Sequence, residues 1–248
     1  MLPLRAVSLA SALLFAACSG ERQSPGAAGP AANAPAADMS PGPAATGAAA
    51  APPGASARLS GRSAELANPD NAAMVFLYLD LAGIAPPIDD WVEQDSRVLH
   101  VPAPAKAAQR KAVRAELESG LAAVRSVGAI RLSLNGAQLS EYDPTHGEFT
   151  VGALAPSSVV SFDALGQKIA LKFGNARAAQ TWRVPPAEAQ AIRDKIGRGG
   201  NVELDALLKV SGVQPGPGGG TIVADVQEYE LRVSRTGAMI GRVQVPRH

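Results

Sequence analysis

The sequence predicts an α+β fold in which N-terminal helices pack on a meandering, mainly antiparallel sheet, preceded by a disordered linker. Apolar residues recur at helical spacing in the first part of the folding region and alternate with polar residues in the second part. Short turn sequences separate the alternating stretches, as is typical of antiparallel strands. In an α+β domain, helices are expected to come first and to be followed by a run of strands.

The first predicted helix lies at the start of the domain. Its apolar positions repeat at the spacing i, i+3, i+4 and i+7, and they are Met74, Leu77, Tyr78 and Leu81. Asp70 or Asn71 is placed to cap the start, and Gly83 is placed to end the helix.

The longest predicted helix covers residues 105–127. One face carries an apolar stripe that consists of Val113, Leu117, Leu121 and Val124. Before this helix, Asp89 and Asp90 begin a short turn that carries Trp91 and Val92.

Strand-like alternation begins at residue 130. Residues 130–134 alternate apolar and polar side chains, and Asn135-Gly136 predicts a two-residue hairpin turn. The strand that leaves this turn is expected over residues 139–142. Asp143-Pro144 followed by Gly147 then indicates a tight turn before Phe149.

Further hairpins fill the rest of the chain. Residues 159–162 and 169–173 flank a turn at 164–167, and residues 181–184 form another strand. Pro185-Pro186 opens a short helix that Gly197 closes.

The last predicted strands enclose two connections of different length. A strand over residues 202–213 is followed by a flexible loop over 214–220. Residues 222–233 and 239–245 form a closing hairpin with a longer turn.

The first residues have the features of an export signal. Arg5 precedes an apolar run over residues 6–17 that is too short to remain as a membrane-spanning helix, so residues 1–17 are predicted to be a cleaved signal peptide. Cys18, the only cysteine, follows this run. An ordinary secretory signal with an incidental cysteine is the alternative, although an unpaired thiol is a liability in an oxidising compartment.

The segment Leu14-Phe15-Ala16-Ala17-Cys18 resembles the lipobox of bacterial lipoproteins, with Phe15 where leucine is usual. The resemblance implies lipid on the Cys18 sulfur, cleavage before Cys18 and acylation, as with palmitate, of the new amino terminus. Ser19 follows instead of aspartate, which by the same resemblance implies anchoring in the outer membrane, facing the periplasm.

Residues 18–58 are predicted to form a disordered linker between the lipid anchor and a single domain at 59–248. The linker is almost wholly Ala, Pro and Gly, so it offers little apolar surface to offset the entropy of ordering. Every aromatic residue of the chain after Cys18 lies in the domain. The net charge of +1 removes electrostatic attraction to nucleic acid as a default role.

No motif nominates catalytic residues or a cofactor. The weak metal candidates His146 and Asp143 lie in a stretch that turn chemistry explains better. His100 has no second histidine at ligand spacing and is expected to be buried or half-buried for structural reasons, and His248 is the last residue. The Gly-rich stretches at 197–200 and 216–220 lack phosphate-loop spacing.

Residues 68–243 resemble a group of uncharacterised bacterial exported domains. The shared features are an amphipathic first helix, the Glu-Tyr-Asp turn at 141–143, the Asn-Ala-Arg segment at 175–177 leading to Trp182, and a closing hairpin. That group carries no assigned activity. The sequence therefore favours a non-enzymatic module that binds a protein or cell-wall component. A cell-envelope hydrolase with a site assembled through space around His100, His146 or Asp143 is the alternative.

Overall fold

The computed structural model describes residues 58–197 and 201–246, and these residues have an α+β fold, as predicted. The predictions for the signal peptide, for Cys18 and for the linker fall outside the described residues. Within the described ranges, no helix is long and apolar enough to cross a membrane.

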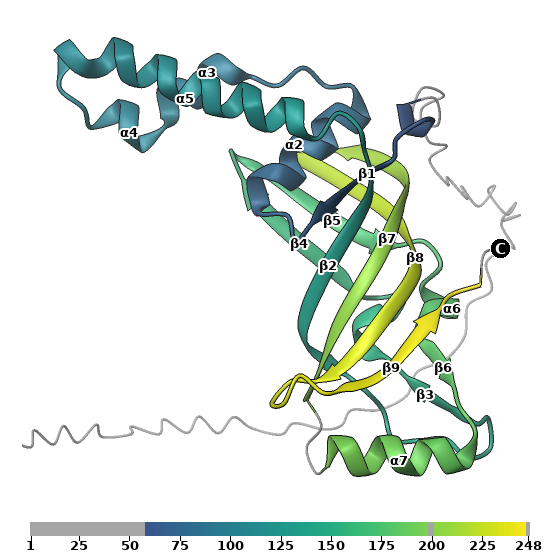
Figure 1. The fold of residues 1–248 in the computed structure, drawn as a ribbon. Coiled ribbons are helices and arrows are strands. Elements are labelled where there is room, and N and C mark those ends of the chain that lie inside the picture. The colour runs from purple at the N-terminus through teal and green to yellow at the C-terminus, as the bar shows by residue number, and fades with distance from the viewer. Residues whose placement is uncertain (1–57, 198–200, 247–248) are drawn as a thin grey trace, which may run out of the picture. The chain divides into compact units, whose positions relative to one another are not determined.

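The elements follow one another in a mixed order (Figure 1). They are β1 (Ala64–Ala67), α2 (Asn71–Ala82), α3 (Ile88–Gln94), α4 (Ser96–Leu99), α5 (Ala103–Ala123), β2 (Val127–Gln138), β3 (Glu148–Thr150), the 3₁₀ helix η1 (Gly152–Leu154), β4 (Val159–Ala164), β5 (Gln167–Phe173), α6 (Ala176–Ala179), β6 (Thr181–Arg183), α7 (Pro186–Ile196), β7 (Asn201–Gly216), β8 (Gly219–Val233) and β9 (Met239–Gln244). The helices are thus not confined to the N-terminal side, because β1 precedes them and α6 and α7 lie between strands.

The main sheet has the order β1-β2-β7-β8-β5-β4, and β9 also pairs with β8. The predicted meander is therefore wrong. β1 pairs parallel with β2, and β5 pairs parallel with β8, whereas the other neighbours are antiparallel. Parallel neighbours need long crossover connections. Here the crossover from β1 to β2 contains α2 to α5.

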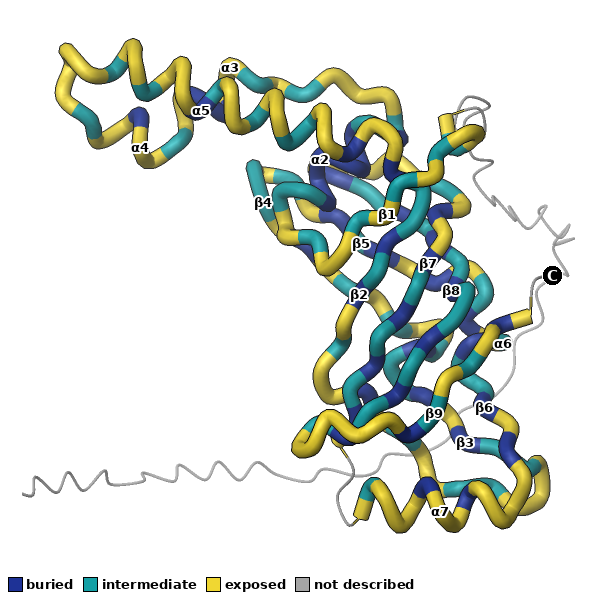
Figure 2. The backbone as a smooth tube through the Cα atoms, in the orientation of Figure 1, coloured by how far each residue is buried: buried dark blue, intermediate teal, exposed yellow. Residues whose placement is uncertain are grey.

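Helix α2 lies in the core and is apolar on all sides, as expected of a fully buried helix (Figure 2). The predicted caps are confirmed: the Asp70 carboxylate accepts from the Ala73 amide (2.7 Å), and Gly83 ends the helix with a φ of 69°. The Tyr78 hydroxyl donates to the Gly219 carbonyl (2.6 Å) at the tip of the β7–β8 hairpin.

Helices α3, α4 and α5 form a helical arm that is mostly exposed (Figure 2). Its own small core consists of Val92, Val98 and Val113. The arm joins α2 where the rings of Phe76 and Trp91 meet at 6.1 Å. Next to them Gly120 is needed, because a Cβ there would lie 2.5 Å from the Phe76 ring.

The predicted bounds of the long helix shift by a few residues. It begins at Ala103, since Pro102 and Pro104 suit a helix start, and it ends at Ala123 because Val127 enters β2 beside β1. Before α5, Asp95 caps the short helix α4 by accepting from the Arg97 amide (2.8 Å).

Arg62 joins the start of the described chain to the ends of α2 and α5. Its guanidinium pairs with Asp80 (2.5 Å) and donates to the Val124 carbonyl (3.3 Å). Only 11% of the Arg62 side chain is exposed. A cavity of about 390 Å³ lies beside this junction and is lined by Ile84 and Arg125, among others.

Two predicted connections differ from the structure. Asn135-Gly136 lies inside β2 as a bulge, where the register with β7 shifts between Leu134 and Ala137. Gly136 has a φ of 72°, and a bulge of this kind demands the same left-handed glycine as a two-residue turn. The predicted 214–220 loop is only the Pro217-Gly218 turn, because β7 and β8 stay paired up to Gly216 and Gly219.

Two further local predictions are wrong. Residues 139–142 form no strand, since Leu139 makes only an isolated bridge to Val151. The expected short turn at Trp91 and Val92 is the helix α3.

The other hairpins and the short helix after Pro185 are confirmed. The β4–β5 hairpin turns at Leu165-Gly166, both with positive φ, and β8–β9 forms the closing hairpin. β6 pairs with β3 in a small second sheet, where Phe149 packs between Tyr142 and Trp182. α7 begins at Pro186 and ends at Ile196, followed by Gly197.

Candidate functional site

The most distinctive feature of the main sheet is a fork beside β8. The first half of β8 pairs with β5 up to Ala224, and the second half pairs with β9 from Glu228 onward. Both partners lie on the edge of β8 that faces away from β7, since β7 pairs with β8 along its whole length. Residues 225–227 of β8 therefore have no strand partner on that edge.

The side chain of Asn175 closes the fork. Its amide nitrogen donates to the Val226 carbonyl (2.9 Å), and its oxygen accepts from the Val226 amide (2.8 Å). On either side, the Gly174 amide donates to Ala224 (2.9 Å) and the Val245 amide donates to Gln227 (2.9 Å). One side-chain amide thus does what a strand residue does elsewhere in the ladder, and the backbone of the fork is satisfied.

A cavity of about 380 Å³ opens at this fork. We call it the fork cleft, and it is lined chiefly by Gly174, Asn175, Lys209, Asp225, Gln227 and Pro246. Its volume is at the small end of the range of small-molecule sites, about 300–1,000 Å³.

The fork cleft presents one positive and one negative side chain. Lys209 and Asp225 are directly opposite each other on β7 and β8. Neither forms an ion pair with any residue in the described part of the chain. The nitrogen of the Gln227 amide donates to the Asp225 carbonyl (3.3 Å), which leaves the Gln227 side-chain oxygen as a further acceptor.

Gly174 determines the position of the Asp225 carboxylate. A Cβ on Gly174 would lie 2.3 Å from Asp225 Oδ1, so any other residue would displace the acid from the wall of the cleft. The carboxylate therefore lies close to the backbone of Gly174.

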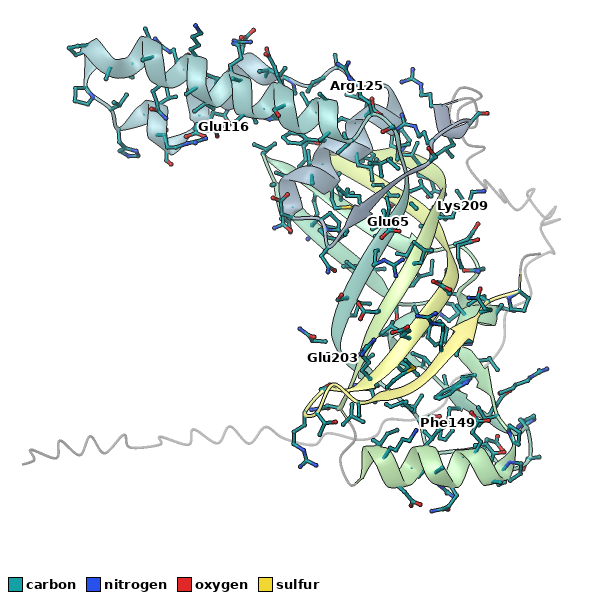
Figure 3. All side chains as sticks on the ribbon, viewed as in Figure 1. Glu65, Glu116, Arg125, Phe149, Glu203 and Lys209 are labelled. Atoms are coloured by element: carbon teal, nitrogen blue, oxygen red, sulfur yellow. The ribbon has the colours of Figure 1, made fainter. Side chains whose placement is uncertain are left out.

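Part of the solvent-facing side of the sheet pairs its own charges. Arg131 bonds to Glu65 (2.7 Å), and Glu230 lies between Arg232 and Arg242. These two guanidinium groups hold the pKa of Glu230 below its usual value. Lys209 and Glu65 are among the side chains labelled in Figure 3.

The predicted metal candidates form a turn. Asp143 accepts from the amide of Thr145 (2.8 Å), and its carbonyl accepts from Gly147 (2.8 Å), so the predicted tight turn is confirmed. His146 Nδ1 lies 2.7 Å from Asp143 Oδ2, which raises the pKa of His146 and lowers that of Asp143. Among the described residues, no group of three or more ligand-type side chains lies together.

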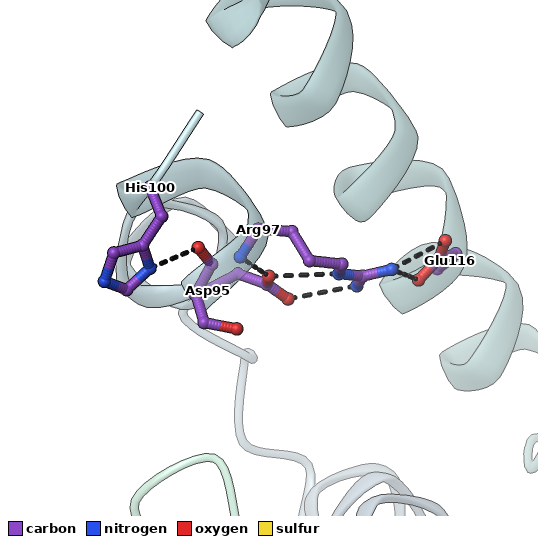
Figure 4. A network of polar contacts seen from close by, with 5 residues as sticks. Asp95, Arg97, His100 and Glu116 are labelled. Atoms are coloured by element: carbon purple, nitrogen blue, oxygen red, sulfur yellow. Dashed lines mark hydrogen bonds and ion pairs between the residues drawn. The ribbon is translucent and has the colours of Figure 1, made fainter. Parts of the chain in front are cut away.

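His100 lies at the end of α4 and is exposed, so the prediction of a buried or half-buried histidine is wrong. Its Nδ1 lies 2.8 Å from the Ser96 carbonyl of the same helix. Arg97, on the other side of α4, bridges Asp95 and Glu116 (Figure 4). His100 and His146 line neither of the two cavities described above.

Sequence reasoning did not find the fork cleft. Lys209 and Asp225 occupy polar positions of alternating strands, which is the ordinary pattern of a solvent-facing surface. Asn175 belongs to the Asn-Ala-Arg segment noted in the sequence, but nothing in that segment indicates a partner 51 residues away. The one local feature that could have indicated the cleft is Gly174 next to Asn175.

Comparison of the chain with protein-family models, with curated proteins and with solved structures finds no match.

Proposed function

We propose that the chain is a non-enzymatic lipoprotein of the bacterial cell envelope, which is anchored through Cys18 and binds an extended segment of a partner protein at the free edge of β4. The anchor would lie in the outer membrane, with the domain facing the periplasm. The observation that carries the binding role is the exposed edge of β4.

The register shows which backbone groups of β4 point outward. In a hairpin with the two-residue turn Leu165-Gly166, the flanking pair Ala164 and Gln167 exchanges hydrogen bonds, and every second pair does the same. Val159, Ser161 and Asp163 therefore direct their N–H and C=O groups away from β5. The Asp163 carbonyl accepts from Asn71 (3.1 Å), and those of Val159 and Ser161 have no partner among the described residues.

The other outer strands carry the usual protection against strand addition. β1 has only four residues and is flanked by the Glu65–Arg131 ion pair. β9 carries Arg242 and is followed by Pro246. Charge, shortness and proline are common ways to block an edge. β4 has six residues and contains no Lys, Arg or Pro; its one charged residue, Asp163, lies near its end, and 46% of Val159 is exposed.

These features favour an extended polypeptide as the occupant. It would bond to the outward groups of Val159 and Ser161, and an apolar residue of the partner would cover Val159. Main-chain bonds would supply the affinity, and alternate side chains would supply the specificity.

The histidines support a binding role over the alternative hydrolase. An acid–base residue must face a substrate site, and both histidines are exposed on a helix end or a turn and bond to neighbours in their own segments.

Ser161→Pro tests strand addition, with Ser161→Ala as the matched control. Proline removes the outward N–H without breaking the bonds to β5, whereas alanine changes only the side chain. With a photo-crosslinking residue at position 159 in intact cells, we expect a discrete protein adduct in the wild type and in Ser161→Ala. The adduct should be lost in Ser161→Pro. An adduct that persists in Ser161→Pro would contradict the proposal.

The anchor has its own test. Cys18→Ser should move the protein from the membrane fraction to the soluble fraction of the cell envelope, because multiple acyl chains are needed for stable anchoring. Unchanged fractionation would remove the lipoprotein assignment without affecting the edge of β4.

A further inference from the structure

We propose that the fork cleft binds a small zwitterionic ligand, a free amino acid or a dipeptide. This site is separate from the edge of β4 and does not depend on the proposed strand addition. The inference rests on the geometry of the fork and on the two opposite charges within it.

The fork is built by specific side chains rather than left over from an irregular sheet. Asn175 makes two hydrogen bonds to Val226 with near-ideal distances, which holds β5 and β9 apart at a fixed position along β8. Without Asn175, the amide and the carbonyl of Val226 would lose their partners at a buried residue. The opening is therefore a stable part of the fold.

The charges in the cleft are arranged for a ligand rather than for each other. Opposite charges on directly facing strand residues commonly pair, since their Cβ atoms are about 4.5–5.5 Å apart. Lys209 and Asp225 face each other in this way but do not form an ion pair. Gly174 leaves room for the Asp225 carboxylate beside the backbone of the fork, on the wall of the cleft.

This combination selects the chemical class of the ligand. An ammonium group would bond to Asp225, and a carboxylate would bond to Lys209. A simple anion or cation would satisfy one of these groups and lie close to the like charge of the other. A metal ion is disfavoured as well, because Asp225 is the only acidic residue among the described residues that line the cleft. The Gln227 oxygen offers an acceptor for a second N–H, such as the peptide group of a dipeptide.

Titration calorimetry on the full-length chain tests the proposal. The probes are L-alanine, D-alanine, L-lysine, L-glutamate and L-alanyl-L-alanine, together with the N-acetyl and the amide derivatives of whichever binds most tightly. We expect at least one probe to bind with a Kd below about 10 mM. Each derivative, which lacks one charge, should bind about tenfold more weakly, because it loses a charge-assisted hydrogen bond.

Variants then assign each end of the ligand. Asp225→Asn should weaken the parent probe and remove the preference for it over its N-acetyl derivative. Lys209→Met should remove the preference over the amide derivative. Lys172→Met and Asp194→Asn change exposed charges that do not line the cleft, so both should bind like the wild type.

Two results would overturn the proposal. One is the absence of binding for every probe on the wild-type chain. The other is a preference for the free amine that survives in Asp225→Asn, since the ammonium would then bind elsewhere. The derivatives test the wild type directly, so a variant that fails to fold does not remove the test.

Discussion

The helical arm and the sheet differ in what stabilises them. The sheet and α2 share one continuous core that includes Tyr78, Leu204 and Tyr229, whereas only three buried valines form the separate core of the arm. The arm adds exposed ion pairs, such as Glu93–Arg110 and Asp89–Arg114, between its helices. Since exposed pairs contribute little, the arm should open locally at a lower free energy than the sheet.

Removing core volume from the sheet should have the largest effect. Leu204 is fully buried in β7, and Leu204→Ala should lower the free energy of unfolding by about 3 kcal/mol. Chemical denaturation would measure this loss for the sheet and α2 together. A loss confined to hydrogen exchange in β7 would contradict the picture of one continuous core.

Arg62→Met should have the next largest effect, because it removes the residue that joins α2 to the end of α5. The free energy of unfolding should fall by about 2 kcal/mol, since hydrogen bonds to a charged group are lost at a largely buried position. Hydrogen exchange should increase first in α5. Arg125→Met, a nearby exposed change, is the control and should alter neither quantity appreciably.

Val98→Ala should loosen the arm alone. It removes about two buried methylene groups, and this loss of apolar burial should lower the free energy of opening the arm by about 1.5 kcal/mol. Hydrogen exchange should accelerate in α3, α4 and the first half of α5 and stay unchanged in β7 and β8. Val213→Ala, at a buried position of β7, is the matched control that should act on the sheet instead. Equal acceleration in both regions would mean that the arm does not open separately.

High salt should act on the arm more than on the sheet, and more weakly than Val98→Ala. Screening shortens from about 8 Å at physiological ionic strength to about 3 Å at 1 M salt. Exchange in the arm should therefore rise with salt, and Arg110→Gln should reduce that dependence because it breaks the pair with Glu93 (2.7 Å). If hydrogen exchange in the arm did not change with salt, the buried valines alone would account for the stability of the arm.

The smallest effect is expected at the exposed pair Asp143–His146 on the sheet side. The raised pKa of His146 gives stabilisation that is complete below its ordinary pKa of 6.5 and is lost as the pH rises through the raised value. The lowered pKa of Asp143 gives stabilisation that is lost as the pH falls below 3.8 and through the lowered value. The pair should therefore act most fully between these two ordinary values.

Asp143→Asn isolates this pair, since asparagine keeps an oxygen for the Thr145 amide but loses the charge. The pKa of His146, followed by NMR, should fall toward its ordinary value. Glu148→Gln, which removes a weaker contribution to the same pKa, should lower it less. An unchanged pKa in Asp143→Asn would contradict the assignment of the shift.

Local signals in the sequence predicted local structure well. Asp70 and Gly83 mark the ends of α2, and Leu165-Gly166 joins β4 to β5, because caps and turns depend on a few neighbouring residues. The hairpin turn predicted at Asn135-Gly136 was wrong because a glycine with positive φ is typical of a bulge as well as of a two-residue turn. β1 was missed because its pairing with β2 joins residues more than 60 positions apart.

The candidate site was hidden for the same reason. That Lys209 and Asp225 form no ion pair within the described part of the chain depends on side-chain placement, and their proximity depends on the register of two long strands. Asn175 can bond to the backbone of β8 only because β5 and β9 pair with different halves of β8 and leave a gap between them. Strand order and register arise from packing of the whole core, which no local pattern encodes.

The Pro217-Gly218 turn also bears on the order in which the chain folds. β7 and β8 pair across only two connecting residues, so this hairpin closes the shortest loop in the main sheet together with β4–β5. The parallel pairings of β5 with β8 and of β1 with β2 close much longer loops and should form later. Because the Tyr78 hydroxyl bonds to Gly219 at the hairpin tip, α2 has a docking point as soon as the hairpin exists. The hairpin would then be the nucleus on which the remaining strands assemble.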